Sequence, residues 1–181
     1  MRNVNKTLVL LMALVFVVGM TGLVAAAGPN ESYVYQDGDH NSVDQDLWGQ
    51  SNVASVNQNG FNNAIRQKTK GSDNVLYTFQ WGNNNQSIQF TNNDWNESVV
   101  YQDGNRNWAK TRQTAQSNVA TIIQDDGNDN AAFINQTAYN NDASISQNGD
   151  GNSGTITQLS QDNTAILSQI GNNNSADITQ Y

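Results

Sequence analysis

Cysteine is absent from this sequence of 181 residues, and proline and histidine occur once each. A small secreted domain with a thin core usually relies on disulfides, so this chain must gain its stability in another way. Charged residues make up only 13% of the sequence, which is rich instead in Asn, Gln, Ser, Thr and Gly. Such a composition is compatible with a disordered or prion-like chain, unless the polar residues recur at a fixed period.

Basic residues are also scarce. Six of the eight lie beyond residue 27, whereas all 16 acidic residues do, so residues 28–181 carry a formal charge of −10. Nucleic acids and anionic lipids attract basic proteins, and this balance argues against both as main partners. The single histidine, His40, lies in a predicted turn, and the sequence shows no nucleophile–base pair, so we predict no enzyme, no metal and no cofactor.

The first 27 residues have the features of a secretory signal peptide. Arg2 and Lys6 precede an apolar run over 8–18, and small residues over 25–27 are of the kind found at cleavage sites. The run is too short to span a bilayer comfortably, so we expect no stable membrane insertion. We therefore predict a secretory signal peptide over 1–27 and a secreted domain over 28–181.

Asparagine recurs every eleven residues through the predicted domain, with one extra residue inserted near 125–127. Fourteen positions share this phase: Asn30, Asn41, Asn52, Asn63, Asn74, Asn85, Asn96, Asn107, Asn118, Asn130, Asn141, Asn152, Asn163 and Asn174. We number each eleven-residue unit from this asparagine. Self-similarity at a fixed period is typical of repeat architectures, so the polar residues are ordered rather than random.

Within each unit, positions one, three, five and seven share a pattern. Position three is mostly small, position five is mostly Val, Ile or Leu, and position nine is usually Gly. Position seven is glutamine in eleven of the fourteen units: Gln36, Gln58, Gln80, Gln102, Gln113, Gln124, Gln136, Gln147, Gln158, Gln169 and Gln180. Alternation with a period of two predicts a β-strand with these residues on one face, and Gly with polar residues after it predicts a turn.

Glycine in the turn is regular only in every second unit, so the full repeat is about 22 residues and occurs seven times. We predict an all-β fold, a two-sheet parallel β-solenoid whose strand–turn–strand repeats stack about 4.8 Å apart. Stacked amides can hydrogen-bond along the stack. The predicted ladder and self-assembly residues are the eleven glutamines together with Asn52, Asn74, Asn96, Asn107, Asn118, Asn130, Asn141, Asn152, Asn163 and Asn174.

The second strand of the first three repeats departs from the pattern. Gln45, Gln67 and Gln89 occupy position five, where burial of a polar group costs energy unless it is paired. Position seven in the same strands is Leu or Thr. We expect the more regular half, 118–181, to start assembly, and we expect the tyrosines at positions four and six to lie on the outer face.

Neither terminal repeat of the sequence shows a cap, so we expect open strand edges at both ends of the solenoid. Because the repeats resemble one another, the two edges should match. Head-to-tail addition would then continue without closing, and the product would be a cross-β homopolymer.

Residues 96–113, NESVVYQDGNRNWAKTRQ, resemble the curlin repeats of bacterial curli fibres. Gln102, Gly104, Asn107, Ala109 and Gln113 lie where that pattern has its Gln, Gly, Asn, Ala and Gln. The resemblance extends over 30–181. It implies an extracellular, cell-surface fibre with roles in biofilm matrix and adhesion, exported and nucleated by curli-type machinery. The last repeat has no basic residue, which favours the major subunit over the alternative, a minor nucleator.

Three other functions fit this repeat less well. A polysaccharide-active solenoid enzyme would need a catalytic cluster, whereas the acidic residues lie mostly in turns. An ice-binding solenoid would present outward Thr in many layers, and few such sites carry one. A calcium-binding solenoid would repeat an acidic loop every turn, whereas the one candidate loop spans 125–129.

Overall fold

The computed structural model describes residues 28–181, and this part of the chain is built from strands without any helix. The predicted signal peptide lies outside the described residues. The strands are β1 (Glu31–Asp37), β2 (Ser42–Trp48), β3 (Val53–Phe61), β4 (Ala64–Lys70), β5 (Val75–Asn83), β6 (Gln86–Asn92), β7 (Glu97–Asn105), β8 (Trp108–Gln113), β9 (Val119–Asp125), β10 (Ala131–Gln136), β11 (Asp142–Asn148), β12 (Ser153–Gln158), β13 (Thr164–Ile170) and β14 (Ser175–Gln180).

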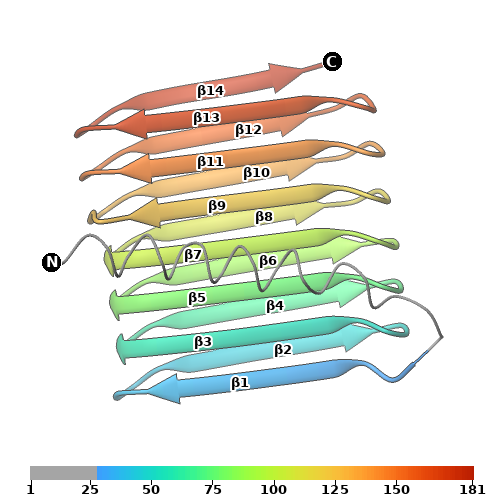
Figure 1. Cartoon of the computed structure of the whole chain (residues 1–181), viewed down its shortest axis with the longest axis horizontal. Coiled ribbons are helices and arrows are strands. Elements are labelled where there is room, and N and C mark those ends of the chain that lie inside the picture. Colours follow the sequence, from blue (N-terminus) through green and yellow to red (C-terminus); the bar gives the residue numbers. More distant parts are fainter. Residues whose placement is uncertain (1–27) are drawn as a thin grey trace, which may run out of the picture.

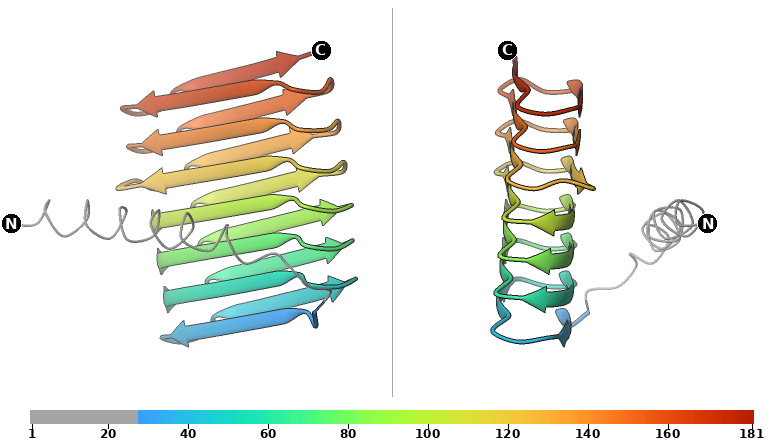
Figure 2. Two further views of the ribbon diagram at one scale, coloured as in Figure 1. Left: turned by 45° about the vertical axis from the view of Figure 1, so that its right-hand side comes forward. Right: turned by 90° about the vertical axis from the view of Figure 1, so that its left-hand side faces the viewer.

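The strands form two parallel sheets of seven strands each, one from the odd-numbered and one from the even-numbered strands. We call these the first and the second sheet, and we call each successive strand pair a coil, from coil 1 (β1 and β2) to coil 7 (β13 and β14). The coils stack in chain order, with coil 1 at one end and coil 7 at the other (Figures 1 and 2). The predicted two-sheet parallel β-solenoid is confirmed.

Pairing between coils keeps each residue beside its equivalent one repeat later. Gln36 pairs with Gln58 and Gln45 with Gln67, an offset of 22 residues. The offset is 23 only for pairs that span the turn after β9, where an additional residue lies, as between Asn105 and Asn128. It is 22 again between β10 and β12 and in the later coils. Asp126 takes a left-handed backbone with φ of 53° in this longer turn. The solenoid therefore absorbs the inserted residue without losing register.

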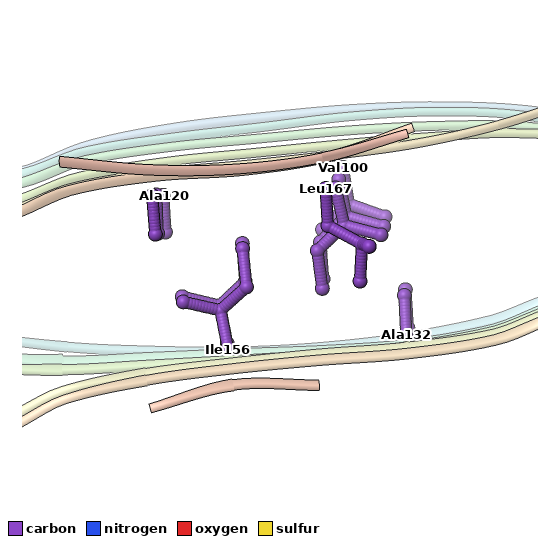
Figure 3. Packing of buried hydrophobic residues seen from close by; sticks show 11 residues of the cluster. Val100, Ala120, Ala132, Ile156 and Leu167 are labelled. Atoms are coloured by element: carbon purple, nitrogen blue, oxygen red, sulfur yellow. The ribbon is translucent and has the colours of Figure 1, made fainter. Parts of the chain in front are cut away.

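The two sheets enclose a thin core in which side chains from alternate positions meet. Figure 3 shows Ala120 and Val100 pointing inward from one sheet toward Ile156 and Ala132 from the other. The contiguous apolar cluster runs from Val100 toward the C-terminal coils, and most of its members are fully buried. In coils 1 to 3 polar side chains take more of the inward positions, so the apolar core is concentrated in coils 4 to 7.

Glycine at position nine allows the turns to stack closely. A Cβ atom on Gly60 would lie 2.0 Å from the carbonyl oxygen of Gly82 in the next coil, and Gly60 has a φ of +122°. A side chain there would clash with backbone and would also strain the left-handed conformation. This explains why glycine is kept where the chain leaves the first sheet in coils 1 to 6, whereas a Cβ atom on Gly171 in coil 7 would meet nothing closer than 3.7 Å.

The outer face of the first sheet differs in one respect from the prediction. Tyr33 and Tyr35 are exposed, as expected, but Tyr77 and Tyr101 are only 6% and 8% exposed. These two tyrosines lie on the outer side of the middle coils, in strands that have a neighbouring strand on both sides. The ring of Tyr101 meets that of Trp81 edge to face at 5.6 Å. Their position was predicted correctly, but their burial was not.

Candidate functional site: amide rows and coil edges

The glutamines at position seven of the first sheet form one hydrogen-bonded row through all seven coils. The side-chain Nε2 of each donates to the Oε1 of the next, at 2.7–2.9 Å, in the order Gln36, Gln58, Gln80, Gln102, Gln124, Gln147 and Gln169. From Gln58 onward each amide also donates across the core to a backbone carbonyl, as Gln124 does to Trp108 at 3.0 Å. A buried amide of this row therefore uses both its N–H groups and its oxygen.

The second sheet has a matching row only in its C-terminal coils. Gln113, Gln136, Gln158 and Gln180 follow one another at 2.9–3.0 Å, each donating to the next. The same amides donate to carbonyls of the first sheet, as Gln158 does to Asp142 at 3.0 Å. We call this the position-seven row of the second sheet.

The three glutamines at position five of the second sheet form a row of their own. Gln45 donates to Gln67, and Gln67 donates to Gln89, both at 2.7 Å. Hydroxyl groups of the first sheet complete this position-five row from across the core. Thr78 donates to Gln89 at 2.9 Å and accepts from Gln67, and Ser32 donates to Gln45. These glutamines are therefore paired, and the expected cost of burying them unpaired does not arise.

The two rows of the second sheet do not join, because the glutamine moves from position five to position seven between β6 and β8. Gln89 instead donates to the backbone oxygen of Ser98 at 3.0 Å and to its hydroxyl at 3.1 Å. Across the break, Thr91 Oγ1 and Gln113 Oε1 are buried without a hydrogen-bond partner. An unpaired buried polar group costs about 1–3 kcal/mol, so the break is a weak plane within the solenoid.

The asparagines at position one are held differently from the glutamines. The Oδ1 of each accepts from the backbone N–H of the asparagine one coil later, as Asn74 accepts from Asn96 at 3.0 Å. Their Nδ2 groups mostly donate to turn carbonyls, as Asn63 does to Gly82 at 2.9 Å. Direct side-chain pairing occurs in places, for example from Asn52 to Asn30 at 3.0 Å. The asparagine row therefore fixes the turns as well as linking the coils.

Cross-coil ion pairs occur on the exposed faces. Lys68 lies 2.8 Å from Asp46, and Arg66 lies 3.5 Å from Asp44. The hydrogen bond from Lys68 holds the pKa of Asp46 below its usual value. Such exposed pairs contribute about 0.2–1 kcal/mol each, so they favour correct register more than they add stability.

The acidic side chains of the candidate calcium-binding loop over 125–129 do not all gather in one cluster. Asp129 pairs with Arg106 through two hydrogen bonds of 2.7 Å, and this contact lowers the pKa of Asp129. The carboxylate oxygens that do gather, within 4.8 Å of one another, belong to Asp103, Asp125 and Asp126. This arrangement occurs at the inserted residue and is not repeated from coil to coil, which is unlike a calcium-binding solenoid.

Among residues 28–181, coils 1 and 7 each have a neighbouring coil on one side only. The strands β1 and β2 form what we call the N-terminal edge, and β13 and β14 form the C-terminal edge. An edge strand presents backbone N–H and C=O groups that can pair with another chain. The amide rows reach the same edges, with Gln36 and Gln45 in coil 1 and Gln169 and Gln180 in coil 7.

Residues 139–171 match the family model of the curlin associated repeat. This segment of the chain is similar to a curlin repeat. The match covers β11, β12 and β13 and includes Gln147, Gln158 and Gln169, so it falls where both sheets have their position-seven rows. A search of curated proteins found no significant match. Within the described residues, no helix is long and apolar enough to cross a membrane.

Sequence reasoning located the glutamines but missed the hydroxyl groups that pair with them. Ser32, Thr78 and Ser98 occupy inward positions of the first sheet that elsewhere carry Ala, Val, Ile or Leu. These substitutions occur in the same coils as, or next to, the glutamines at position five. The coincidence of polar residues on opposite strands was the signal that could have revealed the pairing.

Proposed function

We propose that residues 28–181 are a secreted structural subunit that assembles head to tail into an extracellular, curli-like cross-β fibre. The curlin repeat supports this, because that family is structural rather than catalytic. The β-solenoid supports it as well, since its coils already have the strand spacing and parallel pairing of a cross-β fibre.

One observation carries the proposal: the glutamine row of the first sheet continues through every coil and reaches both edges. At the C-terminal edge this sheet ends with Ala165, Leu167 and Gln169 facing inward, and at the N-terminal edge it begins with Ser32, Val34 and Gln36. When a second copy is added, a small residue therefore faces a small residue, an aliphatic residue faces an aliphatic one, and a glutamine faces a glutamine. The next coil in the fibre is then supplied by another molecule.

The test is whether purified 28–181 forms fibres in buffer without other components. We expect seeded growth and a fibre reflection near ~4.8 Å along the axis. A chain that remains monomeric at high concentration for days, and does not grow on added seeds, would refute the proposed function.

The cellular role follows from the same proposal. A fibre of this kind would serve biofilm matrix and surface adhesion, with export and nucleation by curli-type machinery. The major subunit role is favoured because β13 and β14 carry no basic residue to oppose edge association.

A further inference from the structure

The two edges of the solenoid do not match on the second sheet. In stacking order, coil 7 of one copy would face coil 1 of the next, as coil 1 faces coil 2 within the chain. On the second sheet this places Ile178 against Gln45 and Gln180 against Leu47, since these residues occupy positions five and seven of their strands. At position five the aliphatic residue belongs to the C-terminal edge and the amide to the N-terminal edge, and at position seven the two are exchanged.

The consequence is clearest for Gln180. Its Oε1 accepts from Gln158 at 2.9 Å, and its Nε2 donates to the carbonyl of Thr164 at 3.0 Å. In every interior coil of the row the same nitrogen also donates to the next glutamine. Across the junction Leu47 offers no acceptor, so this donation has no counterpart.

The chain contains an internal precedent for this mismatch. At the break between β6 and β8 the glutamine also changes position, and Gln113 Oε1 and Thr91 Oγ1 are left unpaired there. The second sheet of each copy therefore begins with the position-five row and ends with the position-seven row. When a second copy is stacked on the first, the glutamine has to move back from position seven to position five at the junction.

We propose that the C-terminal edge is complementary to a coil with glutamine at position seven of both strands, and that a second copy of this chain satisfies it on the first sheet only. The inference rests on the proposed fibre. The junction between copies is then half-paired, and it is the plane at which elongation is slowest and fragmentation easiest. A solenoid chain whose first coil carries both glutamines binds this edge more tightly than another copy does.

The test uses a variant of the full domain 28–181 in which the N-terminal edge is changed to match the C-terminal edge. Gln45→Ile with Leu47→Gln gives coil 1 the residues that the C-terminal edge requires. We expect this variant to elongate faster on wild-type seeds and to leave about tenfold less monomer at the plateau, which corresponds to about 1.4 kcal/mol. The matched control is Gln67→Ile with Thr69→Gln, which makes the same kind of change in coil 2 and leaves the edge unaltered.

A second variant tests the same match from the opposite side and guards against misfolding of the first. Ile178→Gln with Gln180→Leu adapts the C-terminal edge to the natural coil 1 and should also strengthen the junction. Combining both pairs restores the mismatch, so the quadruple variant should lose the gain.

The outcomes separate the two claims. Absence of wild-type fibres would refute the proposed function. Wild-type fibres with no gain in either edge variant over the control would refute the junction proposal alone. A gain that persists in the quadruple variant would also refute it, because altered solubility rather than edge matching would then explain the effect.

Discussion

Replacing Gln147 and Gln169 with alanine tests whether the amide row of the first sheet stabilises the solenoid. Gln147 accepts from Gln124 at 2.9 Å and donates to Gln169 at 2.8 Å. Both residues also donate across the core at 2.9 Å, to the carbonyls of Ala131 and Ser153. The double variant Gln147→Ala/Gln169→Ala removes all of these bonds and leaves a gap between the sheets.

The magnitude follows from the groups left behind. One N–H of Gln124 loses its acceptor, whereas the carbonyls of Ala131 and Ser153 lose a second donor but stay paired in their strand ladders. An orphaned buried polar group costs about 1–3 kcal/mol, and the two truncated side chains also leave a gap, so the free energy of unfolding should fall by ~3 kcal/mol or more. This is a large share of the total for a domain of this size, whose stability is usually about 5–15 kcal/mol.

The assay compares urea unfolding and seeded fibre growth of the double variant with a matched control. Ser146→Ala with Ser168→Ala changes the neighbouring outward positions of the same two strands, β11 and β13. We expect the control to behave like the wild type, and the glutamine variant to unfold at lower urea and to elongate slowly. Equal effects of the two pairs would mean that the assignment of inner and outer faces is wrong.

Three further predictions address the turns, the charges and the two halves. Gly60→Ala should destabilise the domain far more than Gly171→Ala, because an added Cβ meets a carbonyl at 2.0 Å in the first case and nothing closer than 3.7 Å in the second; thermal unfolding compares them. Burial raises the pKa of Glu97 in the folded chain. The contribution of this carboxyl group to the stability of the fold is therefore most favourable at a pH below its unfolded pKa, and it is lost as the pH rises through its folded pKa. Glu97→Gln should therefore increase stability near neutral pH and flatten the pH profile, and a loss of stability there would contradict this. Fibres of the piece 118–181 should nucleate with a shorter lag than fibres of 28–117, in which the glutamine row of the second sheet is interrupted between β6 and β8. Equal lag times would show that the continuity of the glutamine rows does not govern nucleation.

The sequence alone was sufficient for the fold because the repeat places equivalent residues fourteen times over. Period-two alternation and glycine turns predict strands, and the eleven-residue phase predicts which residues stack. Even the charge pair of Lys68 with Asp46 follows from a spacing of 22 residues. Wherever an interaction links equivalent positions of successive coils, one-dimensional spacing determines it.

Interactions between unlike positions were not predictable in the same way. The pairing of Thr78 with Gln67 and Gln89 joins opposite sheets, and it depends on how two strands face each other across the core. The burial of Tyr77, which is only 6% exposed on the outer face, does not follow from the alternation of inward and outward positions. The same reasoning explains the edges: the repeats look alike, yet the change of row at β8 leaves the two ends of the second sheet unlike.

Mass per unit length of the fibre tests the central claim most directly. If each molecule contributes seven stacked coils, scanning transmission electron microscopy of unstained fibres of 28–181 should find one chain per about 34 Å of each protofilament, given a coil spacing near ~4.8 Å. Chains that instead each add a single layer would give one chain per ~4.8 Å. That result would contradict a fibre made of intact β-solenoids joined head to tail.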